Sequence, residues 1–211
     1  MAVKLVKPIN YKNIEKITDA DFEKQLKLLG VNSKFIVALS GGPDSLALLY
    51  LAKNFAKKNN LKFTAVSIDH NLREDSSKEI EWIKKLMKKE KVSFVTKKVK
   101  KKISSSNTLS KARKHRYELL TDVCKKNKFK YLLTAHHLDD EIETFLMRLI
   151  RGSGIKGLSS LKPVSKHKGG EINIIRPLLK YSKKCLIKYL AKIKQSYLYD
   201  KTNQNMKYDR S

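Results

Sequence analysis

The sequence has only two cysteines, Cys124 and Cys185, among its 211 residues. Two distant cysteines cannot supply a CxxC pair, a zinc finger or a disulfide framework, which argues against a disulfide-stabilised secreted scaffold. Long apolar runs are also missing: the longest, 46–52, falls far short of the roughly 18 residues that a membrane-spanning helix needs. The N-terminal residues lack the apolar centre of a secretory signal. We therefore expect a soluble, cytoplasmic protein.

Acidic residues are scarce. The 20 Asp and Glu stand against 47 Lys and Arg, giving a formal net charge of +27 and an isoelectric point near 10.0. This balance favours a polyanionic partner, either nucleic acid or an anionic membrane surface. Arginine is scarce too, with seven among the 47 basic residues. Codon bias in an AT-rich genome and solubility are the alternative explanation for the scattered lysines, so the arginines are better candidates for bidentate contacts to phosphate or carboxylate.

Short apolar runs alternate with amphipathic stretches through the middle of the chain. The runs, rich in Val, Ile, Phe and Tyr, predict strands at 35–39, 63–68, 92–95 and 131–135. The amphipathic stretches predict helices at 46–58, 77–89, 109–126 and 138–151. This order predicts an α/β fold, a Rossmann-like parallel sheet flanked by helices, in which ligands bind beyond the carboxyl ends of the strands.

The two ends of the chain depart from this rhythm. A capping pattern at Thr18 and Asp21, followed by Gly30, predicts a helix over 18–30. Residues 1–30 are therefore expected to form an N-terminal helical extension and 31–211 the main domain. Near the other end we expect a loop at 152–170, a short strand at 172–175 and a helix at 182–195. The basic run 97–102 is expected to be a solvated loop.

The segment Ser40-Gly41-Gly42-Pro43-Asp44-Ser45 lies between a predicted strand and a predicted helix. Its glycines let the backbone approach an anion, and its proline suits the first helical turn. The free N–H groups of that turn and the serine hydroxyls would then form a phosphate cradle at the positive end of the helix dipole. No lysine precedes the last serine, so the segment is not a Walker A loop. A plain capped turn is the alternative interpretation.

A second glycine pattern, at 152–157, matches G-x-G-x-x-G. The dinucleotide fingerprint requires a strand before it, and here a helix is predicted instead. We therefore reject a nicotinamide or flavin site.

Polar residues follow two other predicted strands. Asp69 and His70 follow the second strand, at the edge where the adenine and ribose of a nucleotide would lie. The alternative is that they are only the polar residues with which any buried strand ends. After the fourth strand, two histidines lead into a helix whose Asp140 and Glu143 are three residues apart and share a face. That face suits Mg²⁺ held against a pyrophosphate, or an ammonium group. Acids that merely offset a helix dipole are the alternative, but they leave the histidines unexplained.

Two arginines, Arg113 and Arg116, are also three residues apart on a predicted helix. This spacing suits a clamp on triphosphate oxygens or on an RNA backbone. Solvated helix charge is the alternative.

Taken in order, several segments resemble the tRNA(Ile)-lysidine synthase family. The loop 40–45 alone resembles the wider N-type ATP pyrophosphatases, or PP-loop superfamily. The narrower likeness rests on that loop together with 69–73, 112–117, HxxDDxxET at 136–144, R-G-S-G-x-x-G-L at 151–158 and Arg176-Pro177-Leu178-Leu179. It covers about residues 33–210 and implies an adenine nucleotide alpha hydrolase-like fold. Many family members carry a further C-terminal tRNA-binding domain, which we expect to be absent because the chain ends at Ser211.

The family joins free L-lysine to C2 of the wobble cytidine in the CAU anticodon of tRNA(Ile). The resemblance implies that cytidine O2 attacks the α-phosphate of ATP, and that the lysine amine then displaces AMP. The implied cofactor is Mg²⁺, the partners are ATP, L-lysine and the tRNA, and a homodimer is one allowed assembly. The implied residues are Asp44, Asp140, Glu143 and Arg113 for catalysis; Ser40, Gly41, Gly42, Pro43, Asp44, Ser45, Asp69 and His70 for ATP; Asp140 and Glu143 for Mg²⁺; and Arg113, Arg116, Arg151 and Arg176 for tRNA.

Three alternatives stay open at this stage. A tRNA 2-thiocytidine synthase of the same superfamily uses CxxC cysteines and an iron–sulfur cluster, which this sequence cannot supply. NAD or GMP synthases share the loop, but their small substrates do not call for a charge of +27. A non-catalytic tRNA-binding module could keep the loop without its chemistry, although Asp44, Asp140 and Glu143 weigh against this.

Overall fold

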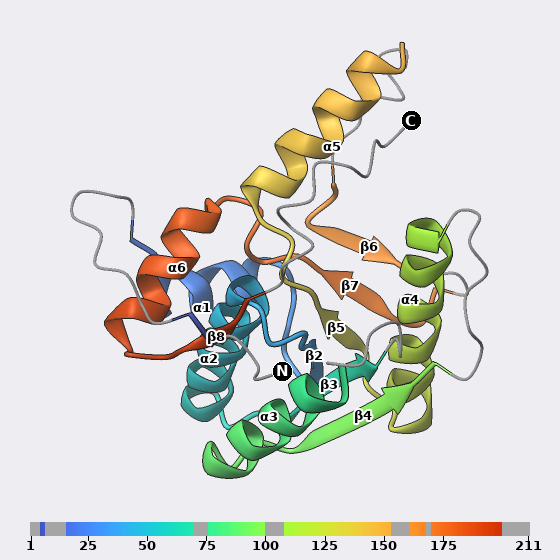
Figure 1. Cartoon of the computed structure of the whole chain (residues 1–211). Helices are drawn as coiled ribbons and strands as arrows, with labels where there is room; N and C mark the ends of the chain where they lie inside the picture. The colour runs from blue at the N-terminus through green and yellow to red at the C-terminus, as the bar shows by residue number, and fades with distance from the viewer. Residues whose placement is uncertain are drawn as a thin grey trace.

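The computed structural model describes residues 5–6, 16–69, 76–99, 108–152, 161–167 and 170–199. Its helices and strands alternate along the middle of the chain (Figure 1). The helices are α1 Asp19–Leu28, α2 Pro43–Lys58, α3 Ser76–Lys89, α4 Thr108–Lys126, α5 Leu138–Ile150 and α6 Lys183–Lys192. The strands are β1 Leu5–Val6, β2 Phe35–Ala38, β3 Phe63–Asp69, β4 Phe94–Lys98, β5 Tyr131–Leu133, β6 Val164–Lys166, β7 Asn173–Ile175 and β8 Tyr197–Leu198.

Six strands form one sheet in the order β4-β3-β2-β5-β7-β6. The strands from β4 to β7 run parallel to their neighbours, and β6 joins the edge antiparallel to β7. The chain moves outward from β2 through β3 to β4, then returns to β5 on the other side of β2. Such a reversal opens a crevice at the carboxyl ends of the strands. The predicted α/β fold with a mostly parallel sheet is confirmed.

Helices cover both faces of the sheet. Successive side chains of the central strand β2 point to opposite faces, and since they are apolar, each face needs a covering layer. Phe35 and Val37 belong to a larger core that also holds side chains from α1, α2, α3 and α6. Ile36, between them, belongs to a smaller core with Leu120 and Cys124 of α4. Each face of β2 is therefore sealed by a different set of helices.

The first described helix, α1, lies within the predicted extension 1–30 and packs in the larger core. Thr18 caps it by accepting a hydrogen bond of 3.1 Å from the N–H of Asp21, as the sequence predicts. Phe22 and Leu26 are fully buried. The carboxylate of Glu23 lies 2.7 Å from both Lys27 and Lys58, which ties α1 to the end of α2.

Three features differ from the sequence-based expectations. Lys97 and Lys98, expected in a solvated loop, extend β4, where an edge strand tolerates charged side chains. The expected loop 152–170 contains β6 within its described part, an edge strand too short and polar to show in the sequence. Strands β1 and β8 pair as a separate two-stranded sheet, and both were missed.

Helix α5 extends away from the rest of the fold (Figure 1). It has no buried residue, and Ile142, Leu146, Leu149 and Ile150 are all exposed. Within the described ranges, no helix has both the length and the apolar character needed to cross a membrane.

Candidate active site

The loop after β2 is closed by its own serine hydroxyls. The Oγ of Ser45 accepts hydrogen bonds from the N–H and the Oγ of Ser40, each at 3.1 Å. The same hydroxyl donates to the carbonyl of Gly42 at 3.1 Å. Pro43 begins α2, where its missing N–H costs nothing. The loop therefore joins the end of β2 to the positive end of a long helix dipole, as a phosphate site requires.

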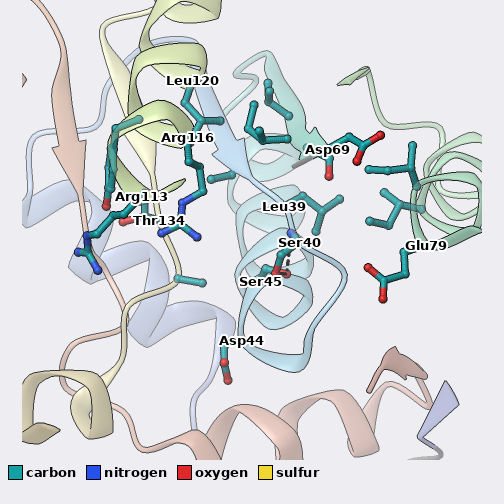
Figure 2. A pocket seen from close by; sticks show the side chains of 18 of the residues that line it. Leu39, Ser40, Asp44, Ser45, Asp69, Glu79, Arg113, Arg116, Leu120 and Thr134 are labelled. Atoms are coloured by element: carbon teal, nitrogen blue, oxygen red, sulfur yellow. Dashed lines mark hydrogen bonds between the residues drawn. The ribbon is translucent and has the colours of Figure 1, made fainter. Parts of the chain in front are cut away.

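A cavity of about 520 Å³ opens at the carboxyl ends of β2, β3 and β5, next to this loop. Figure 2 shows Ser40 and Ser45 in its middle, with the arginines of α4 on one side and Asp69 and Glu79 on the other. Apolar side chains line it as well, including Ile80, Ile83 and Leu120. A pocket with apolar walls and a few convergent polar groups is typical of a small-molecule site. The predicted site residues that line it are Ser40, Asp44, Ser45, Asp69, Arg113, Arg116 and Asp140.

His137 connects the phosphate loop to the acidic start of α5. It is 5% exposed, and its Nε2 lies 3.5 Å from Oδ2 of Asp44 and 3.6 Å from Oδ2 of Asp140. Burial alone would lower the pKa of His137, but the hydrogen bond with Asp44 and the charges of Asp44, Asp140 and Asp139 outweigh it and raise that pKa. The imidazole therefore gathers the carboxylates of two separate elements at one place.

Asp140 also caps its own helix. Its Oδ2 accepts a hydrogen bond of 3.0 Å from the N–H of His137, which satisfies a backbone donor at the start of α5. The carboxylate is thereby held at the rim of the cavity rather than free to rotate.

The neighbouring histidine, His136, is a neutral acceptor. Its Nε2 lies 3.3 Å from an Nη of Arg113, and its Nδ1 lies 3.0 Å from Oγ1 of Thr134. Because a guanidinium can only donate, Nε2 accepts and the ring proton sits on Nδ1. Burial, followed by the charges of Arg113, Arg176 and Arg116, lowers the pKa of His136 to about 3.

The two arginines of α4 crowd the same side of the cavity. Each guanidinium carbon lies 5.8 Å from the ring centre of Tyr117. Burial lowers the pKa of Arg116, and the charge of Arg113 adds to this effect while Tyr117 and Asp140 oppose it. Two like charges in a partly desolvated position gain most from a bound anion. The arrangement is suited to phosphate oxygens.

The residues that line the cavity fit Mg²⁺ bound together with a phosphate. No group of three or more His, Cys, Asp or Glu in the described ranges is arranged to hold a metal by itself. Magnesium, however, is usually held by one or two carboxylates with phosphate oxygens and waters. Oδ1 of Asp44 is buried and has no hydrogen-bond partner, and Asp140 lines the same cavity. An oxygen donor of this kind matches what the ion requires.

Several predicted residues lie elsewhere. Glu143 and Arg151 are exposed and do not line the cavity, so their roles stay predictions. Gly41 and Gly42 shape the loop without lining the cavity, and His70 lies outside the described residues.

Arg176 is buried beside the edge strand β6. It is 8% exposed, and its Nη1 donates to the carbonyl of Lys162 at 2.8 Å and to Oγ of Ser165 at 2.9 Å. This guanidinium joins the end of β7 to the β6 edge, and its contact with tRNA stays a prediction.

The sequence patterns indicate no role for four residues that the structure brings to the site. His136 and His137 were noted only as unexplained neighbours of the acids, and Thr134 was read as part of a strand. Glu79 of α3 also lines the cavity, and no local pattern in the sequence marks it.

Comparison with known proteins decides the family. A family model described as the PP-loop domain matches residues 13–211. The chain belongs to the PP-loop family. Solved structures agree in fold: the PP-loop domain superimposes on the U34-tRNA thiolase NcsA from Methanococcus maripaludis with a TM-score of 0.72 and 23% identity, covering 87% of this chain and 65% of that one. The NH3-dependent NAD synthetase from Campylobacter jejuni gives a TM-score of 0.51 at 14% identity, covering 83% of this chain and 69% of that chain. The adenine nucleotide alpha hydrolase-like fold is confirmed.

Several curated relatives of this PP-loop domain are tRNA(Ile)-lysidine synthases. The tRNA(Ile)-lysidine synthase of Wolbachia pipientis wMel is 44% identical over 183 residues, which cover 85% of this chain and 42% of the relative. The tRNA(Ile)-lysidine synthase of Rickettsia bellii is 44% identical over 179 residues, which cover 85% of this chain and 41% of the relative. The chain thus spans about two fifths of the length of the curated relatives it matches.

Proposed function

We propose that this PP-loop domain catalyses the ATP-dependent ligation of L-lysine to C2 of the wobble cytidine of tRNA(Ile) with a CAU anticodon. The reaction would take place in the cytoplasm. One observation carries the proposal: the phosphate loop, two arginines and two carboxylates converge on a single cavity, in a chain 44% identical to curated tRNA(Ile)-lysidine synthases. The net charge of +27 supplies the non-specific attraction for tRNA.

In the first step, cytidine O2 attacks the α-phosphorus of ATP, an O–P bond forms, and the bond to the β-phosphate breaks. Pyrophosphate leaves with the bonding electrons, and the base becomes adenylated. The loop 40–45 and the start of α2 hold the leaving pyrophosphate, while Arg113 and Arg116 neutralise charge that develops on phosphate oxygens. Mg²⁺, when bound at Asp44 and Asp140, would neutralise the same oxygens. No protein nucleophile is needed, so the chain contributes position and charge.

In the second step, an amine of lysine attacks C2 of the adenylated cytidine. A C–N bond forms, the C2–O bond to the adenylate breaks, AMP leaves, and the amine loses a proton. Asp140 and Glu143 serve either the metal of the first step or the ammonium of lysine, and Arg151 is proposed as a tRNA contact at the end of α5.

A lysine-incorporation assay tests the proposal. The protein is mixed with ATP, labelled lysine and either tRNA(Ile) or tRNA(Met), both with CAU anticodons, and AMP release is followed in parallel. We expect label and AMP with tRNA(Ile) alone. Tight tRNA binding without AMP release would instead identify a non-catalytic tRNA-binding module, and AMP release without lysine incorporation would point to another PP-loop tRNA modification.

A further inference from the structure

The phosphate loop is held from outside by the last described strand. The carbonyl of Gly41 accepts a hydrogen bond from the N–H of Leu198, with an N···O distance of 2.9 Å. A Cβ added to Gly41 would lie 2.5 Å from Cδ1 of Leu198 and 3.1 Å from Cδ1 of Ile83. Gly41 therefore fits between β8 and α3 only because it has no side chain.

This hydrogen bond sets the direction of one peptide group in the loop. In a trans peptide, the carbonyl and the following N–H point in opposite directions. Since Leu198 draws the carbonyl of Gly41 toward β8, the N–H of Gly42 points away from β8. Gly41 has a φ of +84°, in the region where glycine moves freely, so without this bond the peptide would sample other directions.

The strand that makes the contact is itself well anchored. Tyr197 and Leu198 are 6% and 5% exposed, and they pair antiparallel with β1. Both belong to the larger core, together with side chains of α2 and α6. The helix that begins at the loop and the strand that holds the loop thus share one packing unit.

We propose that Leu198 is a positioning residue for the phosphate loop. It acts through Gly41, by fixing the direction of the Gly41–Gly42 peptide and so the shape of the loop that would bind the diphosphate part of ATP. The inference rests on the proposed function, in which that loop binds the leaving pyrophosphate. Fixing the loop before binding removes an ordering cost that the ligand would otherwise have to offset.

The test compares two ligands that share a phosphate but engage different parts of the cavity. Binding of inorganic pyrophosphate with Mg²⁺, and separately of AMP, is measured by calorimetry on the wild type and on Leu198→Ala. Leu198→Ala keeps the backbone N–H that donates to Gly41 but removes the side chain that packs beside it. Because β8 then holds the loop less firmly, we expect pyrophosphate binding to weaken about tenfold. AMP binding should change by less than about twofold, because it lacks the phosphates that the loop would hold. Leu198→Met, which conserves volume, should restore pyrophosphate binding.

Leu190→Ala is the matched control. Leu190 is a fully buried leucine of α6 in the same core, and it is not among the contacts of Gly41. It should leave both affinities near those of the wild type under conditions where circular dichroism shows all variants folded. Where Leu198→Ala fails to fold, Leu198→Val replaces it, with a smaller but still selective loss for pyrophosphate.

An equal loss for both ligands in the Leu198 variant, or the same selective loss in Leu190→Ala, would overturn the positioning role. So would unchanged pyrophosphate binding in Leu198→Ala and Leu198→Val. If the wild-type protein itself binds neither pyrophosphate nor ATP, the proposed function fails instead, which keeps the two failures distinguishable.

Discussion

Asp44 and His137 meet at the carboxyl edge of the sheet, where Oδ2 of the aspartate lies 3.5 Å from Nε2 of the imidazole. They follow β2 and β5, which are neighbours in the sheet. The contact links the phosphate loop to the start of α5, so the two halves of the candidate site are fixed relative to each other. Predictions about the reaction follow from this link.

Replacing Asp44 should strongly reduce AMP formation without weakening the binding of tRNA. Asp44→Asn keeps the size of the side chain but removes the negative charge that would hold Mg²⁺ beside the leaving pyrophosphate, so AMP formation should fall by about 10²-fold or more. Affinity for tRNA, measured by filter binding, should stay within about twofold because no cation is lost. Glu141→Gln, on α5 outside the cavity, is the control and should remain active. Full activity in Asp44→Asn would remove this residue from the mechanism.

Two carboxylates of α5, those of Asp140 and Glu143, should act in different steps of the reaction. Asp140 lines the cavity and Glu143 does not, so Asp140→Asn should reduce pyrophosphate release in the absence of lysine, and Glu143→Gln should reduce only lysine incorporation. Each effect is expected at about tenfold or more. Pyrophosphate release and labelled-lysine transfer, followed on the same samples, distinguish the two steps. Identical profiles for the two variants would show that both residues serve one step.

The charge of Arg113 should be visible in the titration of His136. Burial is the largest cause of the low pKa of His136, about 3, and Arg113 is the next. In Arg113→Ala the imidazolium is no longer repelled by that guanidinium, so the pKa should rise, while burial keeps it below the ordinary value near 6.5. An NMR titration of the imidazole resonances measures this shift. Lys114→Ala, one residue along on the exposed surface, should leave the titration unchanged, and an unmoved His136 in Arg113→Ala would contradict the contact.

Acid should weaken the link between α1 and α2. Hydrogen bonds from Lys27, then Lys58, lower the pKa of Glu23 from 4.5 to about 2. A carboxyl whose pKa is lower in the folded state stabilises the fold above the unfolded pKa and loses that contribution as pH falls toward the folded one. Glu23→Gln should therefore lower the melting temperature at pH 7, and the difference from wild type should shrink between about pH 4.5 and pH 2. A difference that is the same at all pH values would show that these ion pairs add no stability.

Strands β2 and β5 could be predicted because each is a short continuous apolar run that is buried in the sheet. Strand β6 could not, because Val164, Ser165 and Lys166 form a polar edge whose only signal is its pairing with β7. The burial of Arg176 could not be predicted for the same reason. Its guanidinium donates to the carbonyl of Lys162 and the hydroxyl of Ser165, at the β6 edge, and no local sequence pattern shows these contacts.

Within the site, the phosphate loop and Asp140 could be predicted because each belongs to a motif of neighbouring residues in the sequence. The role of His137 could not, since its contact with Asp44 depends on β5 lying beside β2. Leu198 was equally invisible, because it approaches Gly41 from the opposite end of the described chain.

Separate sets of side chains pack on the two faces of the sheet. The larger core lies next to the phosphate loop, and the smaller core includes side chains of α4. Substitutions of polar residues on α4 would therefore leave the packing next to the phosphate loop unchanged. A scaffold of this design can accept substitutions on one side of the cavity while the opposite side keeps its shape.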